Sequence, residues 1–388
     1  MKKYWKTMLI TIIAVLGIGS FYVQSAYTKS LLPDFKIKTE SGSKDIGSSI
    51  SLFGSYYMKD NQEYTNESLR ITEKGSEYHS RLSIIDQQDR RWFGNTDFER
   101  IHKDYRDFMR GNKEFGEIFE DEKWLVSAQL AQEEEEKRVF TFAIMDKNTK
   151  KQMKFDAKIP VQDRSLFYVT DVQRVNNQLK VLVYGSSDAN RENYTLYTFN
   201  IKSRELAAEQ RFGETETKNK ENYYITLFNE LDPLRQSDYT AYIKNYYKQD
   251  GEDNQLERRE YYVINNKTGT EEKISLPSSK GEIQDLFLEN SHVYYTVSEN
   301  GKMKALRYDI KAGKIDLERF IPISKKSFEA VDFKEGVMYA AGKKNSNESY
   351  IKAFSMKTGE EVYSGKIVNR SVKANMTLDI HSISIPRN

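Results

Sequence analysis

A short polar turn recurs along the chain and constrains its fold more than any other feature. Its clearest copy is RYDIKAGK, residues 307–314, in which an aromatic strand end is followed by Asp, a basic residue, a small residue and Gly. The short polar side chain caps its own backbone, and Gly supplies the positive φ that a reversing strand needs. Five other copies share this order, and their leading polar residues are Asp86, Asp146, Asn200, Asn265 and Ser355.

The spacing of these turns indicates an architecture. With Asp309 as the fifth of the six leading residues, successive turns are separated by 60, 54, 65, 44 and 46 residues. A period in the forties, lengthened by insertions, is typical of a four-stranded propeller blade. The 26 Tyr and 20 Phe favour strands with half-buried, pleated surfaces. We therefore predict an all-β fold over residues 50–388, a β-propeller of six or seven four-stranded blades.

Apolar and polar residues alternate around the turns and define the predicted strands. Asn300-Gly301 is the strongest short hairpin signal in the chain. A last alternating run at residues 376–385 needs a neighbour, because an open sheet edge promotes aggregation. We expect it to pair near the start of the domain and to close the ring. The other predicted strands are residues 50–58, 68–72, 80–85, 124–128, 139–144, 166–170, 179–184, 194–199, 293–297, 304–308, 337–341 and 349–354.

One segment of the second repeat has a helical pattern. Thr96 and Glu99 have the spacing of a capping box, and apolar residues then recur at helical intervals as far as Met109. This predicts an amphipathic helix from Asp97 to Arg110, within a helical insertion around residues 97–119. The favoured interpretation is packing on a sheet, with Ile101 and Phe108 buried. The alternative is a partner-binding helix whose contact residues are Tyr105, Phe108, Arg106 and Arg110.

The N-terminus has the pattern of an export segment. Lys2, Lys3 and Lys6 precede an apolar run, and no charge occurs from Thr7 to Thr28. As a helix these residues would extend about 33 Å, enough to span a bilayer. We predict that residues 1–28 form a hydrophobic helix that anchors the chain in the cell membrane by a single span. A cleaved signal peptide, and hence secretion, is the alternative. Both place the following domain outside, after a linker and first-strand region at residues 29–49.

Local motifs for chemistry are missing from the sequence. The absence of Cys excludes disulfides, thiolate metal sites and a cysteine nucleophile. There is no Walker loop, His-Glu-x-x-His or Gly-x-Ser-x-Gly motif. The four histidines, His79, His102, His292 and His381, are scattered, whereas a metal site needs converging ligands. We therefore predict no catalytic, cofactor-binding or metal-ligating residue. The net charge of +2 gives no basic footprint for nucleic acid.

From Trp124 onward the sequence resembles the outer hairpins of bacterial β-propellers. The similarity lies in the aromatic strand, the Asp/Asn-x-Lys-Thr/Ala-Gly turn and the returning strand. With its N-terminal segment, the chain resembles membrane-tethered extracytoplasmic propeller-like proteins of Gram-positive bacteria. This resemblance implies a fold and a location. No WD40 dipeptide, kelch double glycine or sialidase Asp-box is intact, so no functional residue is carried over.

These observations support three hypotheses for function. The first is a non-catalytic binding or scaffold domain at the cell envelope that recognises a protein or a wall polymer. The second is a hydrolase of glycans or lactones whose carboxylates converge from several blades, since such carboxylates leave no local motif. The third is a membrane-bound sensor or regulator. Three or more convergent acidic or His side chains in the central funnel would favour the enzyme, whereas aromatic or uncharged lining would favour binding.

Overall fold

The computed structural model describes fourteen stretches of the chain and short pieces between residues 5 and 20. The stretches are residues 32–60, 63–82, 96–110, 117–133, 137–159, 166–187, 191–213, 222–230, 234–250, 253–277, 282–324, 327–345, 348–369 and 376–386. The chain forms two compact units. The first contains Met1–Arg100, Lys326–Ser355 and Glu360–Asn388, and the second contains Ile101–Lys325 and Met356–Gly359.

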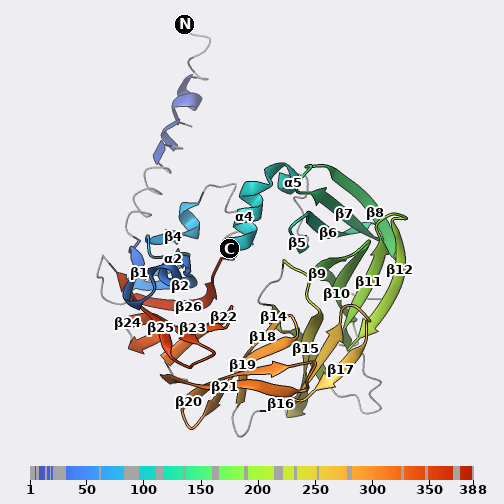
Figure 1. Ribbon diagram of the computed structural model, residues 1–388. Coiled ribbons are helices and arrows are strands. Elements are labelled where there is room, and N and C mark those ends of the chain that lie inside the picture. Colours follow the sequence, from blue (N-terminus) through green and yellow to red (C-terminus); the bar gives the residue numbers. More distant parts are fainter. Residues whose placement is uncertain are drawn as a thin grey trace. The chain divides into compact units, whose positions relative to one another are not determined.

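The second unit contains four sheets that follow one another along the chain (Figure 1). Each has four antiparallel strands, and the short strand β14, which lies between β13 and β15 in the chain, joins the fourth sheet by parallel pairing with β18. The strands are β5 (Glu117–Glu120), β6 (Trp124–Glu133), β7 (Lys137–Asp146) and β8 (Gln152–Ile159); β9 (Leu166–Val175), β10 (Gln178–Ser187), β11 (Arg191–Asn200) and β12 (Glu205–Phe212); β13 (Asn222–Leu227), β15 (Tyr239–Asp250), β16 (Asp253–Asn265) and β17 (Glu271–Ile274); β14 (Asn229–Glu230), β18 (Glu282–Glu289), β19 (His292–Glu299), β20 (Lys302–Asp309) and β21 (Lys314–Ser324).

The first unit contains two sheets, and in each of them a strand from one end of the chain pairs with strands from the other end. The N-terminal strand β1 (Phe35–Gly42) pairs with β25 (Glu361–Asn369) in the sheet of the C-terminal strands, whose others are β24 (Glu348–Ser355), β23 (Val337–Asn345) and β22 (Phe328–Lys334). The C-terminal strand β26 (Met376–Ser384) pairs with β2 (Ser51–Asp60), followed by β3 (Glu63–Ile71) and β4 (Ser76–Tyr78). The predicted pairing of the last strand near the start of the domain is therefore confirmed.

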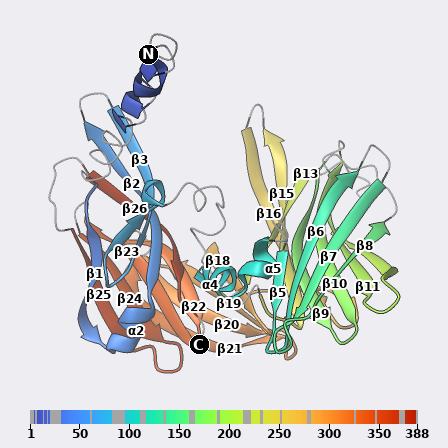
Figure 2. The same cartoon turned by 90° about the horizontal axis from the view of Figure 1, so that it is seen from above.

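The sheet order supports the predicted all-β propeller. Four-stranded antiparallel sheets are the blades of such folds, and the described residues form six sheets with four antiparallel strands each, two of which carry a fifth strand, β1 or β14. Aromatic side chains fill the space between neighbouring sheets. In the core shared by β5–β8 and β9–β12, the ring centroid of Phe199 lies 5.3 Å from that of Phe140 and 4.9 Å from that of Phe142. Figure 2 shows the hairpin of β15 and β16 extending past β13, which pairs only with Tyr242–Tyr247.

The recurrent turn joins the third and fourth strands of its sheet, as its chemistry predicts. Asp146 Oδ1 accepts the backbone N–H groups of Asn148 and Thr149 at 3.0 and 2.9 Å, and Asp309 Oδ1 accepts those of Lys311 and Ala312 at 2.8 and 3.0 Å. The residue four positions after the leading polar residue has a left-handed φ in five turns. These residues are Lys150, Arg204, Gly269, Gly313 and Gly359. The copy at Asp86 lies outside the described residues.

The predicted inserted helix is present as two short helices. They are α4 (Thr96–Asp104) and α5 (Arg106–Arg110), with a turn at Tyr105 between them. Ile101 and Phe108 are 0% and 1% exposed, Tyr105 is half-buried, and Arg106 and Arg110 are exposed. The packing interpretation is therefore correct for Ile101 and Phe108. A side chain as buried as Phe108 offers no surface to a partner, which corrects its place among the candidate contacts.

Two predicted local structures differ from the structure. Residues 29–49, predicted as a linker and first-strand region, contain β1 and also the helix α2 (Lys44–Ser49), which was not predicted. Buried Phe35 and Ile37 alternate with polar residues, and this alternation makes β1 a sheet strand. In the predicted strand at residues 80–85, His79–Arg81 forms a 3₁₀ turn and residues 83–85 lie outside the described residues.

The predicted N-terminal hydrophobic helix is not shown. Residues 1–4, 6, 7, 14, 18 and 21–31 lie outside the described residues. Within the part of the chain that the structure describes, no helix has the length and apolar character needed to cross a membrane.

Candidate functional site

The candidate site is a pocket of 510 Å³ in the second unit. Its volume lies within the range of about 300–1,000 Å³ that is usual for small-ligand sites. The lining comes from the β5–β6 turn, from the end of β9 with its turn into β10, and from the segment before β15. The lining residues are Asp121, Glu122, Lys123, Trp124, Arg174, Asn176 and Gln236.

The β5–β6 turn builds one wall of the pocket. Asp121 Oδ1 accepts the backbone N–H groups of Lys123 and Trp124 at 2.7 and 2.5 Å, and the Asp121 N–H donates to the Trp124 carbonyl at 3.0 Å. A short acidic side chain that caps the following amides is the usual means of fixing a tight turn. The turn places Trp124 at the start of β6, where its half-buried side chain packs against the core of the two neighbouring sheets.

Arg174 supplies the opposite wall and lies against the tryptophan. Its guanidinium carbon is 3.9 Å from the Trp124 ring centroid, and Lys123 Nζ is 5.0 Å from the same ring. Each such cation–π contact stabilises by about 0.5–1 kcal/mol at exposed sites. The Arg174 Nε atom is buried and has no hydrogen-bond acceptor among the described residues. Burial lowers the pKa of Arg174, and the carboxylates of Asp121 and Asp146 partly offset this effect.

The remaining lining is polar. Asn176 occupies the β9–β10 turn with a φ of 56°, a left-handed conformation that Asn adopts more readily than most residues. Asn176 and Gln236 are both exposed. The pocket thus combines two amides, two acids, two bases and one aromatic ring, without an aliphatic side chain. This lining is suited to hydrogen bonding with a polar ligand.

Lys147 connects the inserted helix to the wall of the pocket. Lys147 Nζ pairs with Glu120 Oε1 at 2.8 Å and donates to the Asp121 carbonyl at 2.8 Å. Lys147 Nζ and Lys150 Nζ are also 5.8 and 4.7 Å from the Tyr105 ring centroid. Of the residues predicted to contact a partner, Tyr105 is therefore near the pocket, although it does not line it. A partner role for Tyr105, Arg106 and Arg110 remains a prediction.

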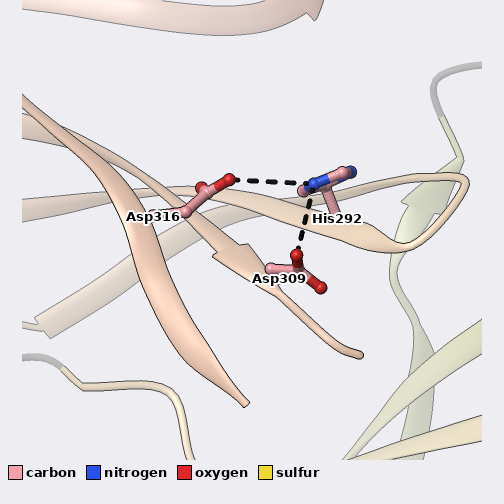
Figure 3. Close-up of side chains that lie close together, drawn as sticks. All are labelled: His292, Asp309 and Asp316. Atoms are coloured by element: carbon pink, nitrogen blue, oxygen red, sulfur yellow. Dashed lines mark ion pairs between the residues drawn. The ribbon is translucent and has the colours of Figure 1, made fainter. Parts of the chain in front are cut away.

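A second polar cluster lies on the neighbouring strands β19, β20 and β21 (Figure 3). His292 Nε2 is 4.0 Å from Asp309 Oδ2 and 3.8 Å from Asp316 Oδ2. Arg307 binds both Asp316 oxygens, at 2.9 and 2.7 Å, and this pairing lowers the pKa of Asp316. Because Arg307 already compensates Asp316 and Asp309 also caps its turn, we assign the cluster to the ion network of these strands.

Half-buried carboxylates occur on the first strands of two sheets in the second unit. Asp171 on β9 accepts a hydrogen bond from Gln173 Nε2 at 2.7 Å, and burial raises the pKa of Asp171 to about 7, with Glu117 adding to the shift. Asp285 on β18 accepts one from Thr296 Oγ1 at 3.0 Å, and burial raises its pKa. Both lie where the strand register is interrupted. Sequence motifs missed these carboxylates because they belong to separate repeats.

Comparisons with known proteins gave distant structural similarity only. No protein-family model matches the sequence, and no curated protein matches it. Among solved structures, TolB from Acinetobacter baumannii is 10% identical, with 87% of this chain and 67% of that chain covered and a TM-score of 0.32. The Dos1 propeller is 8% identical, covers 67% and 74%, and has a TM-score of 0.30. The propeller domain of the trilobed protease from Pyrococcus furiosus is 12% identical, covers 85% and 97%, and has a TM-score of 0.28. The fold assignment above rests on the sheets themselves.

Proposed function

We propose that the chain is a non-catalytic binding or scaffold domain that faces the outside of a bacterial cell and recognises a protein or a wall polymer. The observation that carries this proposal is the pocket at Trp124 and Arg174. It offers a guanidinium group stacked on an aromatic ring and two amide side chains, and it is open to a ligand from outside. These groups can bind a polar ligand, and their arrangement includes no nucleophile paired with a base.

The proposal includes a location and a closed fold. The basic and then apolar N-terminal residues would hold the chain in the cell membrane, and the exchanged strands β1 and β26 would close a six-bladed ring. Protease added to intact, wall-stripped cells should then remove the domain that follows the anchor. Full protection of the domain, with an outer marker protein cleaved in the same sample, would contradict the location.

Binding is tested with the full chain purified in detergent. Sedimentation with isolated cell walls and crosslinking in membranes should each be compared between the wild type and the variant Arg174→Gln. The control is Arg204→Gln, which removes the same charge from a turn outside the pocket. We expect at least one of the two materials to retain the wild type and the control, and to lose most of the Arg174 variant. Failure of both materials to retain the wild type would overturn the proposal.

A hydrolase is the second candidate, and Asp171 is the observation that favours it. A carboxyl group that is half protonated near neutral pH suits general acid catalysis, and Glu117 lies close enough to influence it. This function predicts turnover of a glycan or lactone substrate that Asp171→Asn abolishes while the melting temperature is kept. A screen of both substrate classes that finds no Asp171-dependent turnover would exclude this candidate.

A further inference from the structure

We infer that the pocket at Trp124 and Arg174 takes an uncharged glycan segment that carries acetamido groups. This inference rests on the proposed binding function and specifies its ligand class.

The charge of the lining favours an uncharged ligand. Lys123 and Arg174 contribute two positive charges, and Asp121 and Glu122 contribute two negative charges. An anionic ligand would be attracted by the bases and repelled by the acids, and a cationic ligand would meet the reverse. Hydroxyl and amide groups, which both donate and accept, can use both kinds of side chain without such a loss.

Arg174 is held in place before a ligand arrives. Stacking at 3.9 Å on Trp124 restricts the guanidinium, so that less side-chain entropy is lost when it binds. Its Nε–H group is buried without an acceptor among the described residues, so the terminal N–H groups of the guanidinium are the donors that remain for a ligand. Arg174 is therefore the principal donor of the site, and Trp124 is a positioning residue.

Asn176 and Gln236 account for the acetamido groups. Each offers one carbonyl acceptor and an NH₂ donor, which is the complement of a secondary amide on a ligand. Neither amide appears in a hydrogen bond with another described residue, and both side chains are exposed at the pocket. The lining contains no aliphatic side chain, so an apolar peptide side chain would find no matching surface. A sugar with hydroxyl and acetamido groups fits this lining better.

The ligand test uses the full chain in detergent and a soluble probe, the tetramer of N-acetylglucosamine. Binding is followed by ligand-detected NMR and by tryptophan fluorescence. We expect saturable binding by the wild type, weakened about tenfold or more by Arg174→Gln, because the variant loses a charged hydrogen-bond donor. Arg174→Lys, which keeps the charge but loses the planar guanidinium and its several N–H donors, should also bind more weakly than the wild type. The control Arg204→Gln should bind as the wild type does.

Two further probes define the outcomes. The glucosamine tetramer lacks the acetyl groups and is cationic, and the galacturonic acid tetramer is anionic, so both should bind at least about tenfold more weakly than the acetylated probe. Stronger binding of either one, or equal binding of the acetylated probe by Arg174→Gln, overturns the inference. If cell walls or membrane proteins still retain the wild type while this probe does not bind, the ligand class is wrong and the binding function stands. If neither material nor any probe binds, both fail.

Discussion

The sheets β5–β8 and β18–β21 contain the same turn and use it differently. In both, an Asp side chain caps two backbone amides, and the residue four positions later has a left-handed φ. In β18–β21 that residue is Gly313, and a Cβ atom there would meet only the Tyr308 hydroxyl, at 3.9 Å. In β5–β8 it is Lys150, whose ammonium group lies over Tyr105 of the inserted helix. Both sheets have the same hydrogen bonds in the turn. Only in β5–β8 does the residue with the left-handed φ, Lys150, contact the inserted helix.

This difference indicates that the turn of β5–β8 departs from the repeat at Lys150, where it contacts the inserted helix. A non-Gly residue in the left-handed region costs roughly 1–2 kcal/mol, and the contact with Tyr105 offsets part of this cost for Lys150. The contact with Tyr105 joins the turn to the inserted helix, and Lys147 joins the same turn to the wall of the pocket. The sheet β5–β8, whose turn contacts the inserted helix, thus carries the candidate site, while the sheet β18–β21 carries the ion network of Arg307 and Asp316.

The largest expected effect is that of removing the inserted helix from its packed position. Phe108→Ala should lower the free energy of unfolding by about 3–5 kcal/mol, the usual range for a buried Phe. The neighbouring exposed variant Arg106→Ala is the control and should change it by less than about 0.5 kcal/mol. Urea unfolding measures both. Equal effects of the two variants would show that the helix does not stabilise this part of the chain.

The next prediction tests whether the two turns are equivalent. Asp146→Ala and Asp309→Ala each remove an acceptor for two backbone N–H groups. Each should lower the melting temperature, by less than Phe108→Ala does. Asp146→Ala should in addition weaken binding at the pocket, because its turn carries the lysine contacts to Tyr105 and Glu120. Calorimetry and the binding measurements above would separate these effects, and a binding loss for Asp309→Ala would refute the distinction.

Sequence patterns could predict what is local, and they missed what is assembled from distant segments. The turns follow from Asp, Asn and Gly at fixed places, and Ile101 and Phe108 follow from helical spacing. The pocket unites the β5–β6 turn with Arg174 and Gln236, which lie in other repeats, so no short motif marks it. The cluster at His292 likewise forms by pairing of β19, β20 and β21. The bounds of strand β1 within residues 29–49 were not predicted, because only two of its residues, Phe35 and Ile37, are buried.

The ion network of β18–β21 predicts a dependence on pH. Arg307 holds the pKa of Asp316 below its ordinary value, so the pair stabilises the folded state above about pH 3.9, the usual unfolded value, and this contribution is lost as the pH falls through the lower folded pKa. Asp316→Asn should therefore cost at most about 1 kcal/mol at pH 7 and almost nothing at pH 2. Arg307→Gln should show the same trend. A cost that is constant between pH 7 and pH 2 would exclude the ion pair as its source.

The smallest expected effect distinguishes Lys150 from Arg204, the other cation with a left-handed φ in this turn. Replacement by Gly removes backbone strain of roughly 1 kcal/mol from the folded state. The greater conformational entropy of Gly in the unfolded chain offsets about half of this stabilisation. Arg204→Gly should therefore stabilise by about 0.5 kcal/mol, because no aromatic ring lies under Arg204 among the described residues. Lys150→Gly also loses its contact with Tyr105, worth about 0.5 kcal/mol or more, so its net effect should be zero or slightly destabilising. In a Tyr105→Leu background that contact is absent beforehand, and Lys150→Gly should then stabilise as Arg204→Gly does. Equal gains from Lys150→Gly with and without Tyr105 would mean that the ring does not hold the lysine, and the contrast between the two sheets would lose its physical cause.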